Sequence, residues 1–316
     1  MDMMRPKVTV CVPVYNSEMY IERCVRSLLE QTLKDVEFIF VNDCSTDSSL
    51  SKLKEVVSQY PQRGGRISII DLPENHGLAY VRNLGLKHAN GEYVIHCDSD
   101  DWVEIDMYET LYEEAISTHA DIVVCDILNE YHDRRDVSKF NEKSRAEFLN
   151  QNKWWTVWCR LIKREFLEQH ALTFWDGIDM WEDVNFSMRA HFYAERVSFV
   201  HIPLYHYNRA NINSMLSCKV PQLVSKKLEQ WRKCISLLED FFQQSDIYPS
   251  SFFKRSKLRV VEHYIDTGRI NEVAGLYPEI ATYILGVKRY SFIYRCLLAL
   301  VMLGWPFLFE KYVRLR

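Results

Sequence analysis

The feature that most constrains this fold is an alternation of short apolar runs with longer amphipathic runs over the first 125 residues. The apolar runs begin about every 25–30 residues, the length of a strand–helix–strand unit. They are apolar at successive positions, as in strands that are buried on both faces. The sequence therefore predicts an α/β fold with a mainly parallel sheet between helices, with strands at 7–14, 35–42, 66–71, 92–97 and 121–125.

Composition indicates which partners and which cellular compartment to expect for this protein. The 316 residues suffice for one large or two modest domains, and 47% of them are apolar. The net charge is −4 without a long basic stripe, so nucleic acid is not expected as the partner. The nine cysteines form no CxxC pair, and several lie in apolar runs, which is typical of reduced, buried thiols in a cytoplasmic protein. The N-terminal residues contain no apolar stretch long enough for a signal peptide.

The alternation stops beyond residue 125. Residues 126–150 are polar and are expected to form a connection, whereas residues 151–215 are rich in aromatic side chains. From about residue 219 onward the pattern is helical. These changes predict three regions, at 1–125, 126–215 and 216–316.

Polar residues gather where four predicted strands end or just beyond. The segments are PVYN (13–16), NDCSTD (42–47), ENHGLAYVRN (74–83) and DSDD (98–101). Tyr or Pro can face a base, Asp can accept from base or ribose, Arg can bind phosphate, and paired carboxylates can hold a divalent cation. The sequence has no G-x-G-x-x-G or G-x-x-x-x-G-K-[ST] loop, so metal and arginine would have to hold any phosphate. Each segment alone is equally typical of a helix cap or a turn.

In order, VPVYN, VNDCSTD, ENHGLAYVRN, DSDDW and WEDVNF resemble the motifs of family 2 glycosyltransferases, which have the GT-A fold. The resemblance covers residues 7–215. It implies an inverting transfer of a hexosyl or N-acetylhexosaminyl group from a nucleotide sugar, usually a UDP-sugar, to a glycan or lipid-linked acceptor in surface polysaccharide synthesis. The donor would bind to residues 1–125 and the acceptor to residues 126–215. Asn42, Cys44 and Val81 depart mildly from the family pattern.

The resemblance also implies roles for single residues. Asp98 and Asp100 correspond to the D-x-D pair that binds Mn²⁺ or Mg²⁺, with Asp100 as the direct ligand. His206 and Arg209 lie in Tyr205–Ser214, which resembles the segment that closes over the diphosphate; each could instead be a local hydrogen-bond partner. The full set of expected nucleotide contacts is Pro13, Tyr15, Asp43, Asn75, Arg82, Asp98 and Arg209.

The segment DMWEDVNF carries the expected acceptor chemistry. By resemblance, Asp183 is the catalytic base, Glu182 binds or orients the acceptor, and Trp181 stacks on its sugar. A purely structural interpretation stays open, because Asp179 and Glu182 have capping-box spacing and acids in a first helical turn interact with the helix dipole. A helix N-terminus also lowers the pKa of a carboxylate, whereas a base at neutral pH needs a raised pKa.

Two other classes of function remain as alternatives. A nucleotidyltransferase would also use paired carboxylates and a metal, but it would normally need a basic, glycine-rich phosphate loop near the N-terminus. A sugar-nucleotide-binding protein without activity would not need Asp100 and Asp183. The Q-x-x-R-W motif of processive membrane synthases is not matched by QWRKC at 230–234.

The C-terminal segment Phe292–Arg316 combines apolar and basic residues. Residues 296–309 carry no charge, but this run is too short to span a bilayer and contains Pro306. Two interpretations remain: a segment lying in an anionic membrane surface, or a tail helix packed on the catalytic domain. We favour peripheral attachment to the inner face of the cytoplasmic membrane, where lipid-linked acceptors would lie. The basic residues on either side are Lys254, Arg255, Lys257, Arg259, Lys288, Arg289, Arg295, Lys311, Arg314 and Arg316.

Overall fold

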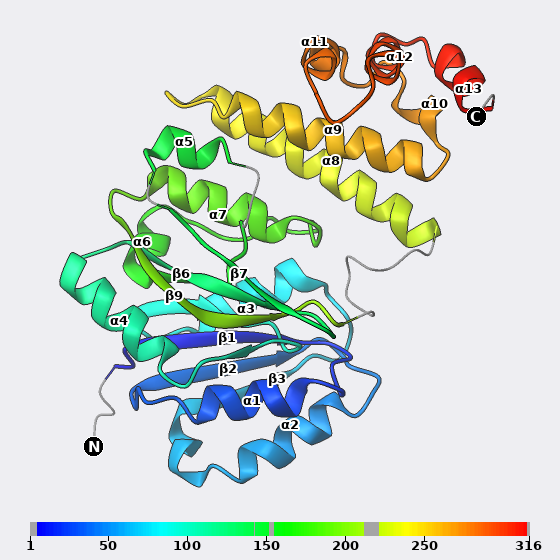
Figure 1. Ribbon diagram of the computed structural model, residues 1–316. Coiled ribbons are helices and arrows are strands. Elements are labelled where there is room, and N and C mark those ends of the chain that lie inside the picture. The colour runs from blue at the N-terminus through cyan, green and yellow to red at the C-terminus, as the bar shows by residue number, and fades with distance from the viewer. Residues whose placement is uncertain (1–4, 142, 152–154, 212–220, 315–316) are drawn as a thin grey trace. The chain divides into compact units, whose positions relative to one another are not determined.

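The structure is a computed structural model that describes residues 5–141, 143–151, 155–211 and 221–314. The chain divides into two compact units (Figure 1). The first comprises Met1–Arg145 and Trp154–Cys218, and the second comprises Ala146–Lys153 and Lys219–Arg316. The division of the first unit into a donor and an acceptor half stays a prediction.

The first unit is built on one mixed sheet in the order β3-β2-β1-β4-β8-β6-β9-β5, with β7 paired to β6. The strands β3, β2, β1 and β4 are all parallel, as expected from their apolar runs, and antiparallel β8 joins them to the rest. The parallel core of the α/β fold is thus confirmed. The strands are β1 Val8–Val14, β2 Val36–Asn42, β3 Ile67–Asp71, β4 Tyr93–His96, β5 Trp102–Val103, β6 Ile122–Glu130, β7 Arg135–Ser138, β8 Arg160–Lys163 and β9 Val197–Asn208.

Helices cover both faces of this sheet. Figure 1 shows α1 and α2 on one face of the first three strands, and α3 packs on β1 and β2 from the other face. The buried residues of α1 are Ile21, Cys24, Val25, Leu28 and Leu29, which form one stripe at helical spacing. The helices of this unit are α1 Ile21–Leu29, α2 Ser49–Ser58, α3 Leu78–His88, α4 Met107–Thr118, α6 Arg164–Gln169 and α7 Glu182–Tyr193.

The expectation that residues 126–150 form a connection is wrong. Strand β6 continues to Glu130, and β7 pairs with it antiparallel. The polar residues that suggested a loop find partners inside the hairpin: Asp126 accepts from the backbone N–H of Phe140 at 2.8 Å, and Asn129 donates to Ser138 at 2.8 Å. Polar side chains can occupy a strand when such bonds satisfy them.

The second unit is helical, as expected from residue 219 onward. Its core includes Leu238, Phe242, Phe253, Val261 and Val301. In the portion of the chain that the structure describes, no helix combines the length and the hydropathy needed to cross a membrane. The helices are α5 Arg145–Leu149, α8 Pro221–Gln243, α9 Ser250–Asp266, α10 Ile270–Val273, α11 Ala281–Leu285, α12 Phe292–Met302 and α13 Phe307–Arg314.

Candidate active site

The carboxyl ends of the parallel strands bring the predicted donor residues to one edge of the first unit. Strand β1 pairs with β2 through Val14 and Asn42, and with β4 through Cys11 and His96. Because these strands run in the same direction, the segments that follow them emerge at the same edge of the sheet. The loops after β1, β2 and β4 therefore adjoin each other.

Asp43 organises the loop between β3 and α3. It is buried, and its carboxylate accepts from the Asn75 side chain at 2.9 Å and from the backbone N–H groups of His76 at 2.8 Å and Gly77 at 3.0 Å. The Asn75 side chain itself is exposed. Asp43 thus fixes the shape of this loop, while its predicted nucleotide contact and that of Asn75 stay predictions.

The loop after β1 presents the predicted base-facing residues. Pro13 is partly buried, and the side chain of Tyr15 is 51% exposed. Asn16 has a positive φ of 47° and accepts from the backbone N–H of Thr46 at 2.8 Å. This bond ties the loop after β1 to the loop after β2, so Tyr15 sits on a braced loop with its ring accessible.

The three carboxylates of DSDD have different environments. Asp98 accepts from Arg82 at 2.8 Å. Asp101 is fully buried and accepts from the Tyr205 hydroxyl and from a backbone N–H of β9, each at 2.7 Å. Asp100 accepts from the uncharged side-chain amide of Asn211 at 2.8 Å, and no salt bridge to its carboxylate occurs within the described ranges.

These environments explain why three like charges can lie so close together. The charge of Asp98 is compensated by its ion pair with Arg82. The pKa of Asp101 is raised well above its usual range, mainly by burial and secondly by the charge of Asp100. Burial, followed by the charge of Asp98, also raises the pKa of Asp100. Asp100 is therefore the carboxylate whose charge a cation would compensate.

Arg82 links the DSDD turn to α7. Its side chain on α3 is 2% exposed; its Nη2 lies 2.8 Å from Asp98 and its Nε lies 3.4 Å from Glu182. Burial opposes its charge, but the carboxylates of Asp98, Glu182 and Asp183 outweigh burial and raise the pKa of Arg82. Arg82 is thus held between two acidic clusters, and its predicted contact with the nucleotide stays a prediction.

Glu182 and Asp183 occupy the first turn of α7. Burial raises the pKa of Asp183 to about 6, against the lowering effect of Arg82. The pKa of Glu182 is raised well above its usual range, mainly by burial and secondly by the charge of Asp183. Asp183 Oδ1 accepts from the backbone N–H of Val184 at 2.8 Å. The increase in pKa caused by burial therefore exceeds the decrease caused by the helix N-terminus. The pKa of Asp183 is thus compatible with a base near neutral pH.

The residues just before α7 do not form the capping box that their spacing suggested. Asp179 does not cap α7; its Oδ1 accepts from the backbone N–H of Ala79 at 3.1 Å and thus caps α3. Trp181 precedes the first residue of α7 with a left-handed φ of 66°, which is rare for a bulky residue and marks a constrained position. Its predicted contact with the acceptor stays a prediction.

The segment after Leu204 corrects one expectation. His206 cannot fold over a ligand, because its ring is buried in β9 between Glu104 and Glu130, each 2.8 Å from one ring nitrogen. Arg209 is exposed at the end of β9, and its guanidinium lies 4.4 Å from the ring centroid of Tyr207. Residues 212–214 of the expected closing segment lie outside the described residues.

Asp98 and Asp100 fit a hard divalent cation. Their carboxylate oxygens are the donors that Mg²⁺ and Mn²⁺ prefer, and a cation would relieve the repulsion that raises the pKa of Asp100. Within the described ranges no three His, Cys, Asp or Glu side chains are arranged so that together they could hold a metal ion. Two carboxylates match the way Mg²⁺ commonly binds, with substrate phosphates completing its shell.

Sequence reasoning missed several residues that build this site. Asn211 positions Asp100, Asn208 donates to the Asp100 carbonyl at 3.1 Å, and Tyr205 holds Asp101. All three come from β9 or just beyond it, 104–111 positions from their partners. Only the resemblance of the segment at 205–214 pointed toward them.

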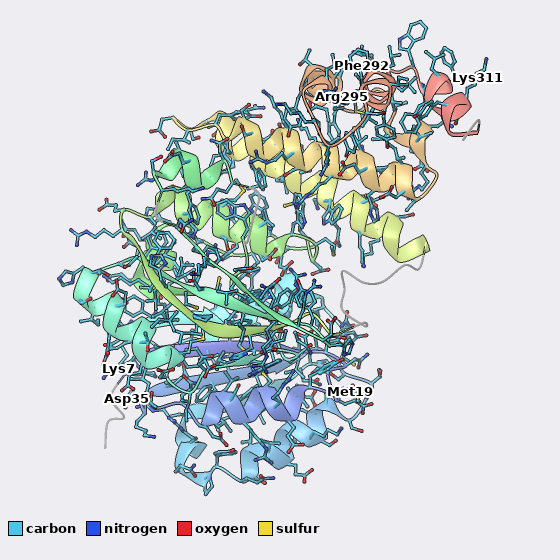
Figure 2. All side chains as sticks on the ribbon, viewed as in Figure 1. Lys7, Met19, Asp35, Phe292, Arg295 and Lys311 are labelled. Carbon is cyan, nitrogen blue, oxygen red and sulfur yellow. The ribbon has the colours of Figure 1, made fainter. Side chains whose placement is uncertain are left out.

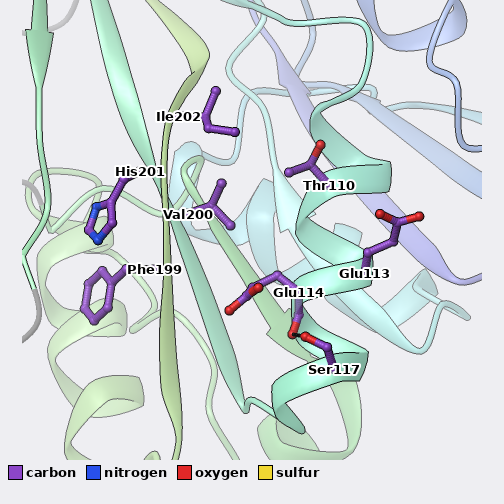
Figure 3. A pocket seen from close by; sticks show the side chains of 8 residues that line it. All are labelled: Thr110, Glu113, Glu114, Ser117, Phe199, Val200, His201 and Ile202. Carbon is purple, nitrogen blue, oxygen red and sulfur yellow. Dashed lines mark hydrogen bonds between the residues drawn. The ribbon is translucent and has the colours of Figure 1, made fainter.

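A separate shallow hollow lies between α4 and the earlier portion of β9 (Figure 3). It contains none of the predicted site residues, and its carboxylates come from neighbouring positions on α4 rather than from strand ends. The hollow is therefore separate from the cluster around Arg82. The hollow is lined by Thr110, Glu113, Glu114, Ser117, Phe199, Val200, His201 and Ile202.

Comparisons with known proteins identify the family of this chain. The model of the family described as Glycosyl transferase family 2 matches residues 9–172. The putative glycosyltransferase EpsH of Bacillus subtilis (strain 168) is 33% identical over 247 residues, which cover 74% of this chain and 70% of EpsH.

Two solved structures share the fold. S. aureus TarS 1-349 in complex with UDP-GlcNAc matches with a TM-score of 0.65 at 20% identity, covering 98% of this chain and 92% of that chain. The mannosyltransferase PcManGT from Pyrobaculum calidifontis in complex with GDP-Man and Mn2+ matches with a TM-score of 0.58 at 16% identity, covering 98% of this chain and 89% of that chain. The α/β architecture expected from the motifs, with a helical C-terminal region, is thereby confirmed. This chain belongs to glycosyl transferase family 2.

Proposed function

We propose that this glycosyltransferase moves a hexosyl or N-acetylhexosaminyl group from a UDP-sugar to a hydroxyl of a glycan or a lipid-linked sugar, with inversion at the anomeric carbon. The observation that carries the proposal is the buried bridge of Arg82 between Asp98 and Glu182. It joins the carboxylates suited to a metal–diphosphate to the candidate base within one charged cluster. Such a cluster can hold a donor and an acceptor next to each other.

Asp98 and Asp100 would hold Mn²⁺ or Mg²⁺ together with the donor diphosphate. When bound, the ion compensates the negative charge that develops on the leaving nucleoside diphosphate. Asp100 is the direct ligand in this proposal, because Asp98 already pairs with Arg82. Asn211 fixes the orientation of the Asp100 carboxylate through one oxygen, Oδ2.

Asp183 would remove the proton from the acceptor hydroxyl. Its Oδ1 is engaged by the N–H of Val184, so Oδ2 is the atom that takes the proton. The acceptor oxygen then forms a bond to the anomeric carbon while the bond from that carbon to the diphosphate oxygen breaks. A pKa of about 6 keeps the carboxylate mostly ionised near neutral pH, yet basic enough to accept a proton.

The remaining contacts position the two substrates. Tyr15 and Pro13 would face the base, and Asp43 with Asn75 would bind the base or ribose. Arg209, exposed at the end of β9, would approach the diphosphate. On the acceptor side, Trp181 would stack on a sugar ring and Glu182 would orient it.

The acceptor belongs to the construction of a surface polysaccharide in this proposal. Its support is the motif resemblance to transferases that build bacterial polysaccharides and glycolipids. A lipid-linked acceptor would be met at the inner face of the cytoplasmic membrane, to which the protein would attach peripherally.

The test is release of nucleotide from a panel of UDP-sugars and GDP-mannose in Mn²⁺, with and without EDTA. We expect free UDP from at least one UDP-sugar and loss of that signal in EDTA. Release of pyrophosphate from a sugar phosphate and UTP would favour a nucleotidyltransferase instead. Tight binding of UDP-sugars without release, even with acceptor glycans added, would favour an inactive binding protein.

A further inference from the structure

The second unit carries a cluster of exposed apolar side chains. Of the fifteen large hydrophobic residues that are exposed in the described portion of the chain, seven lie within residues 285–308. The other eight are spread along the chain between Tyr15 and Tyr248. A concentration of this kind marks a surface that binds something. We call it the C-terminal apolar surface: Leu285, Phe292, Ile293, Leu303, Trp305, Phe307 and Leu308.

This surface is held rigidly from within. Helix α12 packs into its unit through Leu298, Val301 and Met302, each of which is fully buried. The helix then ends in a tight turn in which Gly304 adopts a φ of 89° and the N–H of Trp305 donates to the carbonyl of Leu300 at 2.9 Å. A packed helix and a hydrogen-bonded turn therefore fix the backbone that carries the exposed side chains.

Phe292 and Leu303, at the two ends of α12, lie on the same side of the helix by their spacing. Phe292 and Leu303 are eleven positions apart, about three helical turns. At the first end, Arg295 donates to the carbonyl of Leu285 at 2.7 Å and lies 5.8 Å from the Phe292 ring. At the second end, the rings of Trp305 and Phe307 lie 6.0 Å apart. Phe292 is 70% exposed and Trp305 is 56% exposed, so both rings project into solvent.

The charge around this surface is one-sided. Residues 285–314 contain five basic residues and one acidic residue, Glu310. Lys288 and Lys311 are exposed, and neither has a carboxylate partner within the described ranges. Figure 2 shows Phe292, Arg295 and Lys311 on α12 and α13. The upstream basic group contributes less than the sequence suggested, because Lys257 is bound by Glu239 and Glu279 at 2.7 Å each.

We propose that the C-terminal apolar surface docks onto an anionic lipid bilayer. Phe292, Trp305 and Phe307 would enter the boundary between headgroups and acyl chains, and Lys288 and Lys311 would contact lipid phosphates. Aromatic rings beside lysines suit this boundary, whereas a protein partner would not require so basic a border. The inference deepens the lipid-linked acceptor of the proposed function, but it rests on the surface and not on the transfer reaction.

The packed face of α12 makes truncation unsuitable as a test, so point variants are needed. Binding of the full chain to vesicles of phosphatidylglycerol and phosphatidylcholine is measured by co-sedimentation, with pure phosphatidylcholine vesicles alongside. The apolar variant is Phe292→Ser/Trp305→Ser/Phe307→Ser, and the charge variant is Lys288→Gln/Lys311→Gln. A control variant changes three exposed apolar residues of the first unit, Ile105→Ser/Ile116→Ser/Val137→Ser.

We expect the wild type to bind anionic vesicles and the control variant to bind equally. The apolar variant should lose about tenfold in partitioning per ring, and the charge variant about fivefold per lysine. Unchanged melting temperatures establish that the variants fold. The proposal would be overturned if the wild type failed to bind the vesicles, or if the control variant lost as much binding as the apolar variant. It would also be overturned if the wild type proved to be a dimer in solution that only the apolar variant dissociates, because the surface would then be an interface between two copies of the chain. UDP release in solution is measured on the same proteins, so failure of the transferase assignment is seen separately from failure of docking.

Discussion

Asp183→Asn provides a stability test of the base assignment. A carboxylate kept at a pKa of about 6 against an ordinary value of 3.8 is destabilising in its ionised form. At 1.36 kcal/mol per pKa unit, this shift corresponds to ~3 kcal/mol against the folded state at high pH. Asn has nearly the same shape and can still accept from the N–H of Val184. The variant is therefore expected to be more stable than the wild type at neutral pH, although it loses activity.

The pH dependence gives the sign of the effect. Because the folded-state pKa is the higher one, the folded state binds more protons between the two pKa values, and stability falls as pH rises through that window. The cost of the Asp183 carboxylate becomes constant only well above the folded-state pKa of about 6, where the group is fully ionised in both states. The advantage of the Asn variant should thus grow by ~1.4 kcal/mol between about pH 5 and about pH 8, and then level off.

Urea denaturation followed by tryptophan fluorescence at several pH values measures this difference. Glu55→Gln, which removes an exposed carboxylate from α2, is the matched control and should show no comparable trend. An Asn variant that is less stable than the wild type at every pH would identify Asp183 as a structural helix-terminal residue. A stability gain that does not vary with pH would refute the raised pKa.

The remaining predictions concern activity and one backbone position. Asp183→Asn should lower kcat by about 10²–10⁴-fold while donor binding stays near that of the wild type, and the wild-type rate should rise with pH through about 6. Asp100→Ala should abolish transfer and weaken donor binding, and EDTA should do the same to the wild type; full activity in EDTA would exclude the metal role. Arg82→Met should move the acid limb of the pH–rate profile to higher pH, because Arg82 lowers the pKa of the base; a raised donor KM with an unmoved limb would instead indicate a nucleotide contact alone. Gly77→Ala should destabilise the fold by ~1–3 kcal/mol in thermal unfolding, because its φ is 89° and its Cβ would lie 2.6 Å from the carboxylate that caps α3, whereas Gly64→Ala, with nothing within 4 Å, should be nearly neutral.

The parallel half of the fold could be predicted because its signals are local. Continuous apolar strands and amphipathic helices alternate within short windows, and strand ends place Asp43 and Asp98 at one edge without any knowledge of long-range contacts. The motif resemblance added Asp183, whose position in a first helical turn was equally typical of a cap. Its raised pKa comes from burial, which a linear pattern does not display.

The remaining features depend on partners that are far apart along the chain. Asp179 caps a helix that begins about 100 residues earlier, and His206 is fixed by two glutamates that lie 76 and 102 positions away. The hairpin at 126–138 has the polar composition of a connection, because its polar residues gain partners only when the two strands pair. Local spacing therefore indicated which residues gather at the candidate site, but not the distant partners that hold them in place.

Calorimetric titration of UDP in the presence of Mn²⁺ tests the central claim most directly, because it isolates the metal–diphosphate site from acceptor and sugar. We expect UDP to bind to the wild type only when Mn²⁺ is present, this binding to be lost in Asp100→Asn, and binding to stay near normal in Asp183→Asn. Equal binding of UDP by the wild type and Asp100→Asn, or binding that EDTA leaves unchanged, would contradict the assignment of the DSDD turn as the donor site.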